Sequence, residues 1–137
     1  MQRLRRHRAF TLIELLLVLV ILAVLAAVVV PKFTNRSEQA KITAAKTDIS
    51  NMETALDVYE TDCGRYPTGD EGLQALVTNV GNLPEWKGPY LKRLNQDPWG
   101  HPYVYTSPGQ HNTSGVDLYS MGPDGREGQD DIANWAQ

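Results

Sequence analysis

The chain is poor in the residues that build disulfides, zinc sites and catalytic centres. Cys63 is the single cysteine among 137 residues, so no disulfide can form within the chain. Its three histidines, His7, His101 and His111, are too scattered in sequence to suggest a zinc pair. No Ser/His/Asp or Cys/His combination has supporting sequence context, and no glycine-rich phosphate loop follows a predicted strand. The sequence therefore argues against an enzyme.

Acidic residues are missing from the start of the chain and abundant afterwards. Residues 1–9 contain four arginines and no acid. Without these arginines, nine Lys and Arg face sixteen Asp and Glu, a net charge of −7. A body of this charge gives no reason to expect nucleic acid as a partner. The length allows one modest domain behind a leader.

Residues 15–30 form an unbroken apolar run. A helix over residues 10–30 would be roughly 31 Å long, close to the bilayer core of about 30 Å. The arginines before it place the N-terminus in the cytoplasm and the body outside. Three interpretations compete: a cleaved secretory signal, a plain signal anchor, or a segment in which Glu14 has a function.

The residues around the run bear on these interpretations. The run is longer than a secretory signal core, and Pro31-Lys32-Phe33 behind it suits signal peptidase badly. A plain anchor does not explain Glu14, since a carboxylate in a membrane segment costs about 2–3 kcal/mol at mid-depth and less near the edge.

The helix is expected to continue past Pro31. Apolar residues recur at alternating spacings of three and four, and they predict one buried stripe on an amphipathic helix. These residues are Ile42, Ala45, Ile49, Met52, Leu56 and Tyr59. Gly64 is a plausible stop, so the pattern predicts one helix from Thr11 to about Asp62, kinked at Pro31.

Turns dominate the chain after Gly64. Residues 70–77 read as a short helix with acids at its start, and residues 97–100 as a turn. Alternation at residues 103–105 and 116–120 predicts two strands of a small antiparallel sheet. The expected fold class is therefore α+β.

The segment Ala9-Phe10-Thr11-Leu12-Ile13-Glu14, between a basic leader and the apolar run, closely resembles the class III signal of type IV pilins and type II secretion pseudopilins. The resemblance implies that a prepilin peptidase cuts between Ala9 and Phe10 and methylates the new amine of Phe10. It also implies that Glu14 meets the N-terminal ammonium of a neighbouring subunit. One departure is Ala9, where the family nearly always has glycine.

The body resembles one branch of that family, the major pseudopilins of type II secretion. The resemblance rests on five ordered segments: residues 64–68, 72–76, 88–91, 97–100 and 122–125. It implies a type IV pilin-like fold with a basic leader (1–9), a transmembrane and assembly helix (10–31), and a periplasmic domain (32–137). In this fold the long helix, half membrane and half amphipathic, packs on a small antiparallel sheet with irregular loops.

Residues 122–132 place four carboxylates among glycines. Calcium prefers such hard oxygens in flexible loops, but composition alone favours a solvated acidic turn. The resemblance instead implies one structural calcium. Its expected ligands are Asp124, Asp130, Asp131 and the backbone carbonyl of Met121. The loop looks shorter than in the family, so the second acidic pair has no unique alignment.

The leading hypothesis is a structural subunit that polymerises through its apolar helix into a helical pseudopilus and supports export of folded proteins across the outer membrane. The implied partners are further copies of the chain, minor pseudopilins, the prepilin peptidase and the inner-membrane assembly platform. The implied location is the bacterial inner membrane, single-pass, with the C-terminal domain in the periplasm. The alternatives are a type IV pilin of a surface fibre and a monomeric membrane-anchored periplasmic binding module.

Overall fold

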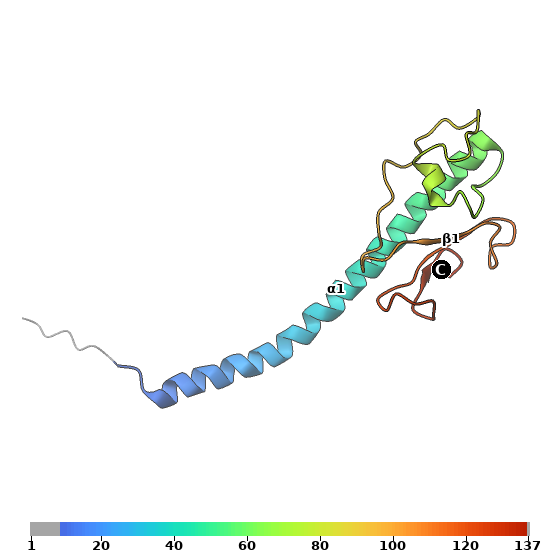
Figure 1. The fold of residues 1–137 in the computed structure, drawn as a ribbon. Helices are drawn as coiled ribbons and strands as arrows, with labels where there is room; N and C mark the ends of the chain where they lie inside the picture. Colours follow the sequence, from blue (N-terminus) through green and yellow to red (C-terminus); the bar gives the residue numbers. More distant parts are fainter. Residues whose placement is uncertain (1–8, 137) are drawn as a thin grey trace, which may run out of the picture. The chain divides into compact units, whose positions relative to one another are not determined.

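The computed structural model describes residues 9–136, with the backbone alone for residues 30–34. Figure 1 shows one long helix followed by a 3-10 helix and short strands. These elements are α1 (Leu12–Cys63), η1 (Leu73–Leu76), β1 (Val104–Thr106), β2 (Asp117–Ser120) and β3 (Ile132–Ala133). The prediction of one continuous helix is confirmed to within one residue at each end, and α1 passes through Pro31.

The chain divides into two compact units, one ending at Glu38 and the other beginning at Gln39, and α1 contributes residues to both. In the first unit, the segment Leu12–Val29 is long and apolar enough to cross a membrane. Its large apolar side chains are exposed, as is Phe10, with exposed fractions from 45% at Val29 to 79% at Phe10. A helix with apolar side chains exposed in this way needs lipid or neighbouring helices around it.

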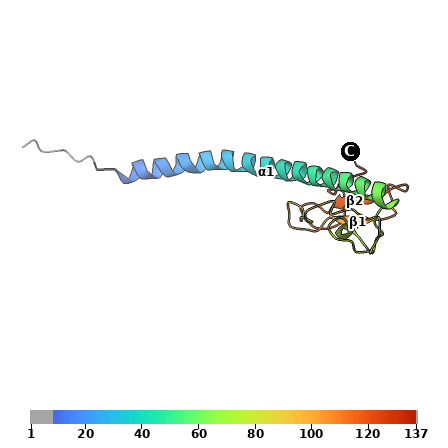
Figure 2. The ribbon, with the colours of Figure 1, turned by 90° about the horizontal axis from the view of Figure 1, so that it is seen from above.

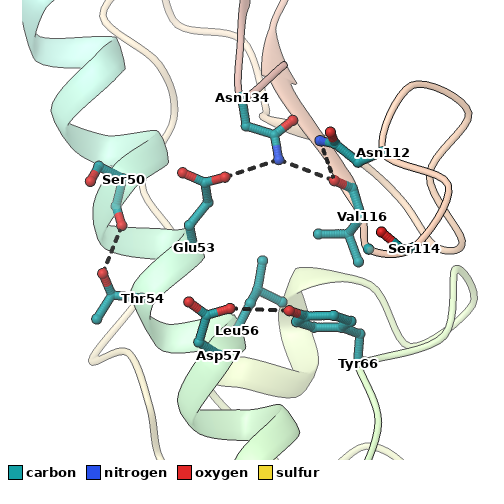
Figure 3. Close-up of a pocket in the computed structure, with 11 residues that line it drawn as sticks. Ser50, Glu53, Thr54, Leu56, Asp57, Tyr66, Asn112, Ser114, Val116 and Asn134 are labelled. Carbon is teal, nitrogen blue, oxygen red and sulfur yellow. Dashed lines mark hydrogen bonds between the residues drawn. The ribbon is translucent and has the colours of Figure 1, made fainter. Parts of the chain in front are cut away.

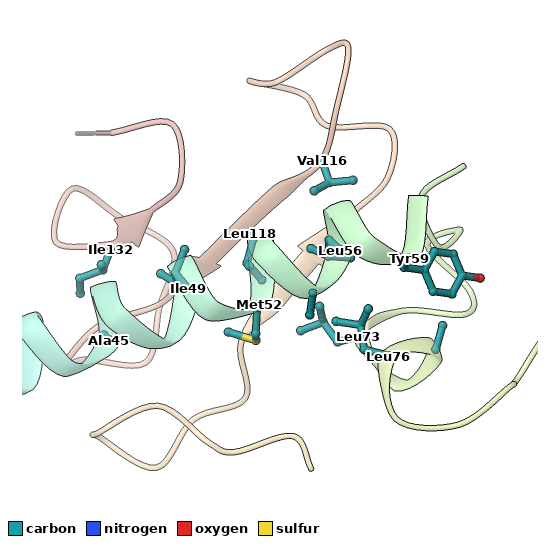
Figure 4. Close-up of a cluster of buried hydrophobic side chains, with 12 residues drawn as sticks. Ala45, Ile49, Met52, Leu56, Tyr59, Leu73, Leu76, Val116, Leu118 and Ile132 are labelled. Carbon is teal, nitrogen blue, oxygen red and sulfur yellow. The ribbon is translucent and has the colours of Figure 1, made fainter. Parts of the chain in front are cut away.

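The second unit, called the head below, is built on the apolar stripe of α1 (Figure 4). Leu56 and Tyr59 on α1 are 1% exposed, and Leu118 on β2 is completely buried. A fully buried leucine contributes about 1.5–3 kcal/mol relative to an exposed one. The predicted stripe is confirmed, because its residues from Ala45 to Tyr59 are buried and Ile42 is partly buried.

A three-stranded antiparallel sheet, in the order β1-β2-β3, completes this core. Figure 2 shows β1 and β2 against one side of the C-terminal half of α1. Tyr105 pairs with Leu118 across β1 and β2, and Ser120 pairs with Ile132 across β2 and β3. Two strands were predicted and lie where expected to within a residue, whereas β3 was not, because two residues are too few to show alternation.

Asn134 extends this sheet and joins it to the helix. Its backbone N–H donates to the carbonyl of Leu118 at 3.0 Å, and its Oδ1 accepts from the Leu118 N–H at 3.1 Å. Its Nδ2 donates to Glu53 on α1 and to the Val116 carbonyl, both at 3.0 Å. One amide side chain therefore connects the C-terminus, β2 and α1.

Tyrosine hydroxyls tie the loops of the head to aspartates on the polar faces of α1. Three such bonds measure 2.9–3.1 Å: Tyr66 to Asp57, Tyr90 to Asp62 and Tyr103 to Asp48. Burial, followed by the neighbouring carboxylates, raises the pKa of Tyr66 and Tyr103. The hydroxyls therefore remain protonated donors well above neutral pH, and these contacts supplement the small core.

The predicted helix at residues 70–77 is wrong in extent, since only Leu73–Leu76 form the 3-10 helix. Gly72 has a φ of 58°, which is not a helical conformation, so the helix cannot include the residues that precede Leu73. Glu71 forms a capping box instead: Thr68 N–H donates to its carboxylate at 2.8 Å, and its own N–H donates to Thr68 Oγ1 at 3.3 Å. Arg65 adds a bidentate pair to the same carboxylate, at 2.8 and 2.9 Å.

The Arg65–Glu71 pair predicts a pH-dependent stability of the head. The Arg65 guanidinium, more than any other group, lowers the pKa of Glu71 from 4.5 to about 2. Because the folded-state pKa is depressed, the stabilisation is complete above the unfolded value and is lost as pH falls from about 4.5 to about 2. We expect Glu71→Gln to cost about 1 kcal/mol at neutral pH, because solvent partly screens the pair.

The measurement is unfolding of the full chain in detergent micelles, followed by tryptophan fluorescence between pH 2 and 7. Glu85→Gln, which removes an exposed carboxylate elsewhere in the head, is the control. If Glu71→Gln and the parent chain lost stability equally over this acidic range, the assignment would be wrong.

Candidate functional site

The N-terminus of α1 holds Glu14 through a reciprocal pair of hydrogen bonds. Thr11 N–H donates to Glu14 Oε2 at 2.9 Å, and Glu14 N–H donates to Thr11 Oγ1 at 3.3 Å. This is a capping box, formed by the Thr-x-x-Glu spacing. Glu14 was predicted from the sequence to have a function but Thr11 was not, although the three-residue spacing between them is the signal of a capping box. Ala9 and Phe10 lie exposed immediately before the helix.

The capping box explains how a carboxylate is accommodated beside an apolar segment. Backbone N–H groups in the first turn of a helix have no partner within the helix, and Glu14 accepts one of them. Within residues 9–136, Oε2 is the only oxygen of the Glu14 carboxylate that accepts a hydrogen bond. No described residue engages Oε1, and an exposed carboxylate oxygen can pair with a cation.

The acidic loop, residues 121–131, leaves β2 at Met121 and returns to β3. Asp130 lies against Gly122, since a Cβ on Gly122 would be 2.9 Å from the Asp130 carbonyl and 3.2 Å from its carboxylate. Gly122 also has a φ of +67°, a conformation that other residues rarely adopt. The two ends of the loop therefore meet at Gly122 and Asp130, and we call this contact the neck of the loop. A larger residue than Gly122 would force Asp130 to move.

The carboxylates of this loop are partly occupied by its own backbone. Asp124 Oδ1 accepts from Arg126 N–H at 2.9 Å, and Asp131 Oδ2 accepts from Gly128 N–H at 3.2 Å. Asp131 Oδ1 is buried and has no hydrogen-bond partner among the described residues, 9–136. The residues that the structure describes include no group of three or more acidic, His or Cys side chains arranged to hold a metal ion.

The fit to a cation is therefore partial. Burial of an unpaired carboxylate oxygen is unfavourable, and a cation at Asp131 Oδ1 would relieve it. Burial, then the charges of Glu127, Asp131 and Asp117, raises the pKa of Tyr119. Met121 and Asp124 lie in the first part of the same loop, whose ends meet where Asp130 packs against Gly122.

A polar groove lies between α1 and the loop before β2 (Figure 3). Its volume is about 530 Å³. Its two carboxylates already accept hydrogen bonds within the chain, Glu53 from Asn134 and Asp57 from Tyr66. Each of these carboxylates is engaged through one oxygen, and the remaining polar lining consists of hydroxyl and amide groups, so the groove brings together no nucleophile and base.

Serine, histidine and aspartate meet at one place in the head. Ser120 Oγ donates to Asp97 Oδ2 at 2.5 Å, and His101 Nδ1 lies 3.8 Å from the same oxygen. Ser120 is completely buried and bonds to the aspartate rather than to the imidazole. A nucleophile needs an accessible hydroxyl with a base beside it, so this arrangement is structural.

Comparison with known proteins finds family models and relatives that match most of the chain. Residues 32–135 match the family described as type II secretion system (T2SS), protein G, and residues 4–30 match the prokaryotic N-terminal methylation motif. Two curated relatives are type II secretion system core protein G of Pseudomonas aeruginosa and of Klebsiella pneumoniae. The first is 49% identical and the match covers 98% of this chain and 99% of that protein. The second is 48% identical, over 96% of each.

A solved structure supports the fold as well as the sequence relationship. The crystal structure of the major pseudopilin from the type 2 secretion system of enterohaemorrhagic Escherichia coli matches with a TM-score of 0.66 and 38% identity. The match covers 80% of this chain and 98% of that structure. The long helix with its small antiparallel sheet is therefore the type IV pilin-like fold. The chain belongs to the protein G family of the type II secretion system, the family of the major pseudopilin.

Proposed function

We propose that this chain is the structural subunit of a type II secretion pseudopilus, polymerising through the apolar half of α1 to support export of folded proteins across the outer membrane. The observation that carries the proposal is the exposed apolar segment Leu12–Val29, continuous with a folded head of the protein G family. The chain is a structural protein and not an enzyme.

The same segment supports a membrane-anchored subunit before assembly. The arginines before Ala9 keep the N-terminus in the cytoplasm, so the head lies in the periplasm and the helix crosses the inner membrane once. The prepilin peptidase cuts between Ala9 and Phe10 and methylates the new amine. Copies of this chain, minor pseudopilins and the inner-membrane assembly platform are the partners in building the fibre.

Glu14 acts in assembly as the partner of a neighbour's Phe10 ammonium. A carboxylate and an ammonium are each costly in an apolar surrounding, and pairing them lowers that cost. The capping box fixes the rotamer of Glu14 and leaves an oxygen for the neighbour. Two copies therefore associate in the register at which these two charges meet.

Substitution of Glu14 separates its two roles. Glu14→Gln keeps an oxygen for the capping box but removes the charge, since glutamine also serves at this position. We expect Glu14→Gln to lower pseudopilus formation and secretion about tenfold or more, because the neighbour's ammonium is left unpaired. Thr11→Val removes the capping hydroxyl and keeps the charge, so its effect should be smaller. Wild-type assembly and secretion by Glu14→Gln would refute the pairing role.

Ala9 controls how fast the N-terminal amine appears. A subsite built for glycine accommodates a methyl group less well, so we expect Ala9→Gly to accelerate processing and Ala9→Val to slow it. Pulse-chase labelling in cells that contain the prepilin peptidase measures the rate at which the precursor disappears. Equal rates for all three chains would show that this position does not contact the peptidase.

The acidic loop binds one calcium ion, for which Asp124, Asp130, Asp131 and the Met121 carbonyl are the proposed ligands. The unpaired Asp131 Oδ1 and the closed neck at Gly122 support this assignment. When bound, the ion would supply positive charge that joins the two ends of the loop. Its role is therefore to stabilise the C-terminal part of the head.

Calorimetric titration of the full chain in detergent with calcium chloride tests this site. We expect one binding event, and about 2.7 kcal/mol of added stability at a calcium concentration one hundred times the Kd. Asp131→Asn should weaken binding, while Glu85→Gln, outside the loop, should not. The absence of calcium-dependent heat together with an unchanged melting temperature would eliminate the site.

A further inference from the structure

Asp97 is a buried carboxylate at the centre of the turn that precedes β1. Its side chain is completely inaccessible to solvent. Its Oδ1 accepts from the backbone N–H groups of Trp99 at 3.1 Å and His101 at 2.8 Å, which closes the turn. Its Oδ2 points instead to β2, where it accepts from Ser120 Oγ at 2.5 Å. The two oxygens therefore join two separate parts of the chain.

Ser120 links Asp97 to the acidic loop. Its hydroxyl donates to Asp97 and accepts from Gly122 N–H at 3.1 Å. Gly122 is the residue against which Asp130 packs at the neck of the loop. Asp97 therefore orients the Ser120 hydroxyl, and this hydroxyl in turn fixes the peptide group between Met121 and Gly122.

His101 forms a second connection between the turn and the loop. Its ring lies against Gly125, where an added Cβ would be 2.7 Å from Nε2. The backbone N–H of the same residue is one of the donors to Asp97. The turn at residues 97–101 therefore contacts the acidic loop at Gly122, through Ser120, and at Gly125.

We propose that Asp97 is a positioning residue for the acidic loop, which it holds through Ser120 and Gly122 before any cation arrives. The loop departs from β2 in a fixed direction because the Ser120 hydroxyl has a single arrangement that satisfies both neighbours. Binding of a cation then requires less ordering of the loop. This last consequence depends on the proposed calcium site, whereas the positioning itself does not.

Hydrogen exchange of the full chain in detergent, in calcium-free buffer with chelator, tests the positioning. Ser120→Ala breaks the connection to the loop and leaves both turn-closing bonds of Asp97 intact. We expect amides of residues 121–131 to exchange about tenfold faster, as loss of one buried hydrogen bond predicts. Amides of α1 within the head should keep the parent rates. Ser114→Ala, which removes an exposed hydroxyl, is the matched control and should change neither.

A second variant covers the case in which Ser120→Ala does not fold. Asp97→Asn preserves the side-chain volume and the oxygen that closes the turn, but its Nδ2 can only donate to Ser120 Oγ, so the Ser120 proton loses its acceptor. The amides of residues 121–131 should also exchange faster in this variant. The double variant should exchange no faster than either single variant, because both substitutions remove the same connection. Unchanged loop exchange in the variants, or equal acceleration throughout the head, would overturn the proposal.

Calcium titration of the same variants separates this inference from the calcium assignment. If the parent chain binds calcium, Ser120→Ala should weaken binding about tenfold by the same bond loss, and Ser114→Ala should not. Equal affinity of the parent chain and Ser120→Ala would contradict the consequence for binding. If the parent chain binds no calcium, the calcium assignment fails, and loop exchange alone decides the role of Asp97.

Discussion

The apolar stripe on the C-terminal half of α1 is the contact on which the head depends. The three strands are short, β3 has only two residues, and none of them could form a stable sheet without an apolar surface to cover. Leu56 and Tyr59 supply that surface, and Leu118 on β2 covers it. The same helix carries Leu12–Val29, whose side chains remain exposed. One element therefore provides both the core of the head and the surface for lipid or neighbouring subunits.

Because the core is small and no disulfide is possible, polar contacts hold many of the loops of the head. Tyrosine hydroxyls bond to α1 aspartates, Asn134 joins β2 to α1, and Arg65 pairs with Glu71. Asp97 does the same for the turn before β1 and, through Ser120, for the acidic loop. Each bond contributes modestly, but each fixes a segment that lacks regular secondary structure. The loops are consequently ordered by side chains rather than by strand ladders.

The sequence predicts the parts of this fold that depend on periodicity. Apolar residues at spacings of three and four, Leu56 among them, predict α1 and its buried face. Alternation of apolar and polar residues predicts β1 and β2. Periodicity fails where single side chains decide the structure. β3 is too short to show a pattern, and the extent of η1 depends on the conformation of Gly72. The hydrogen bond between Asp97 and Ser120 joins residues 23 apart in the sequence, so no local pattern predicts it. The hydrogen bonds between Thr11 and Glu14 do follow a recognisable pattern, the three-residue spacing of a capping box.

We propose that the apolar segment is kept as part of the mature subunit, which then begins with a methylated amine at Phe10. Glu14, the exposed segment Leu12–Val29 and the protein G family all fit that arrangement. The most direct test is the intact mass of the protein extracted from membranes of cells that contain the prepilin peptidase. We expect loss of residues 1–9 and gain of one methyl group. A mass that retains the leader, or one that lacks the whole apolar segment, would contradict it.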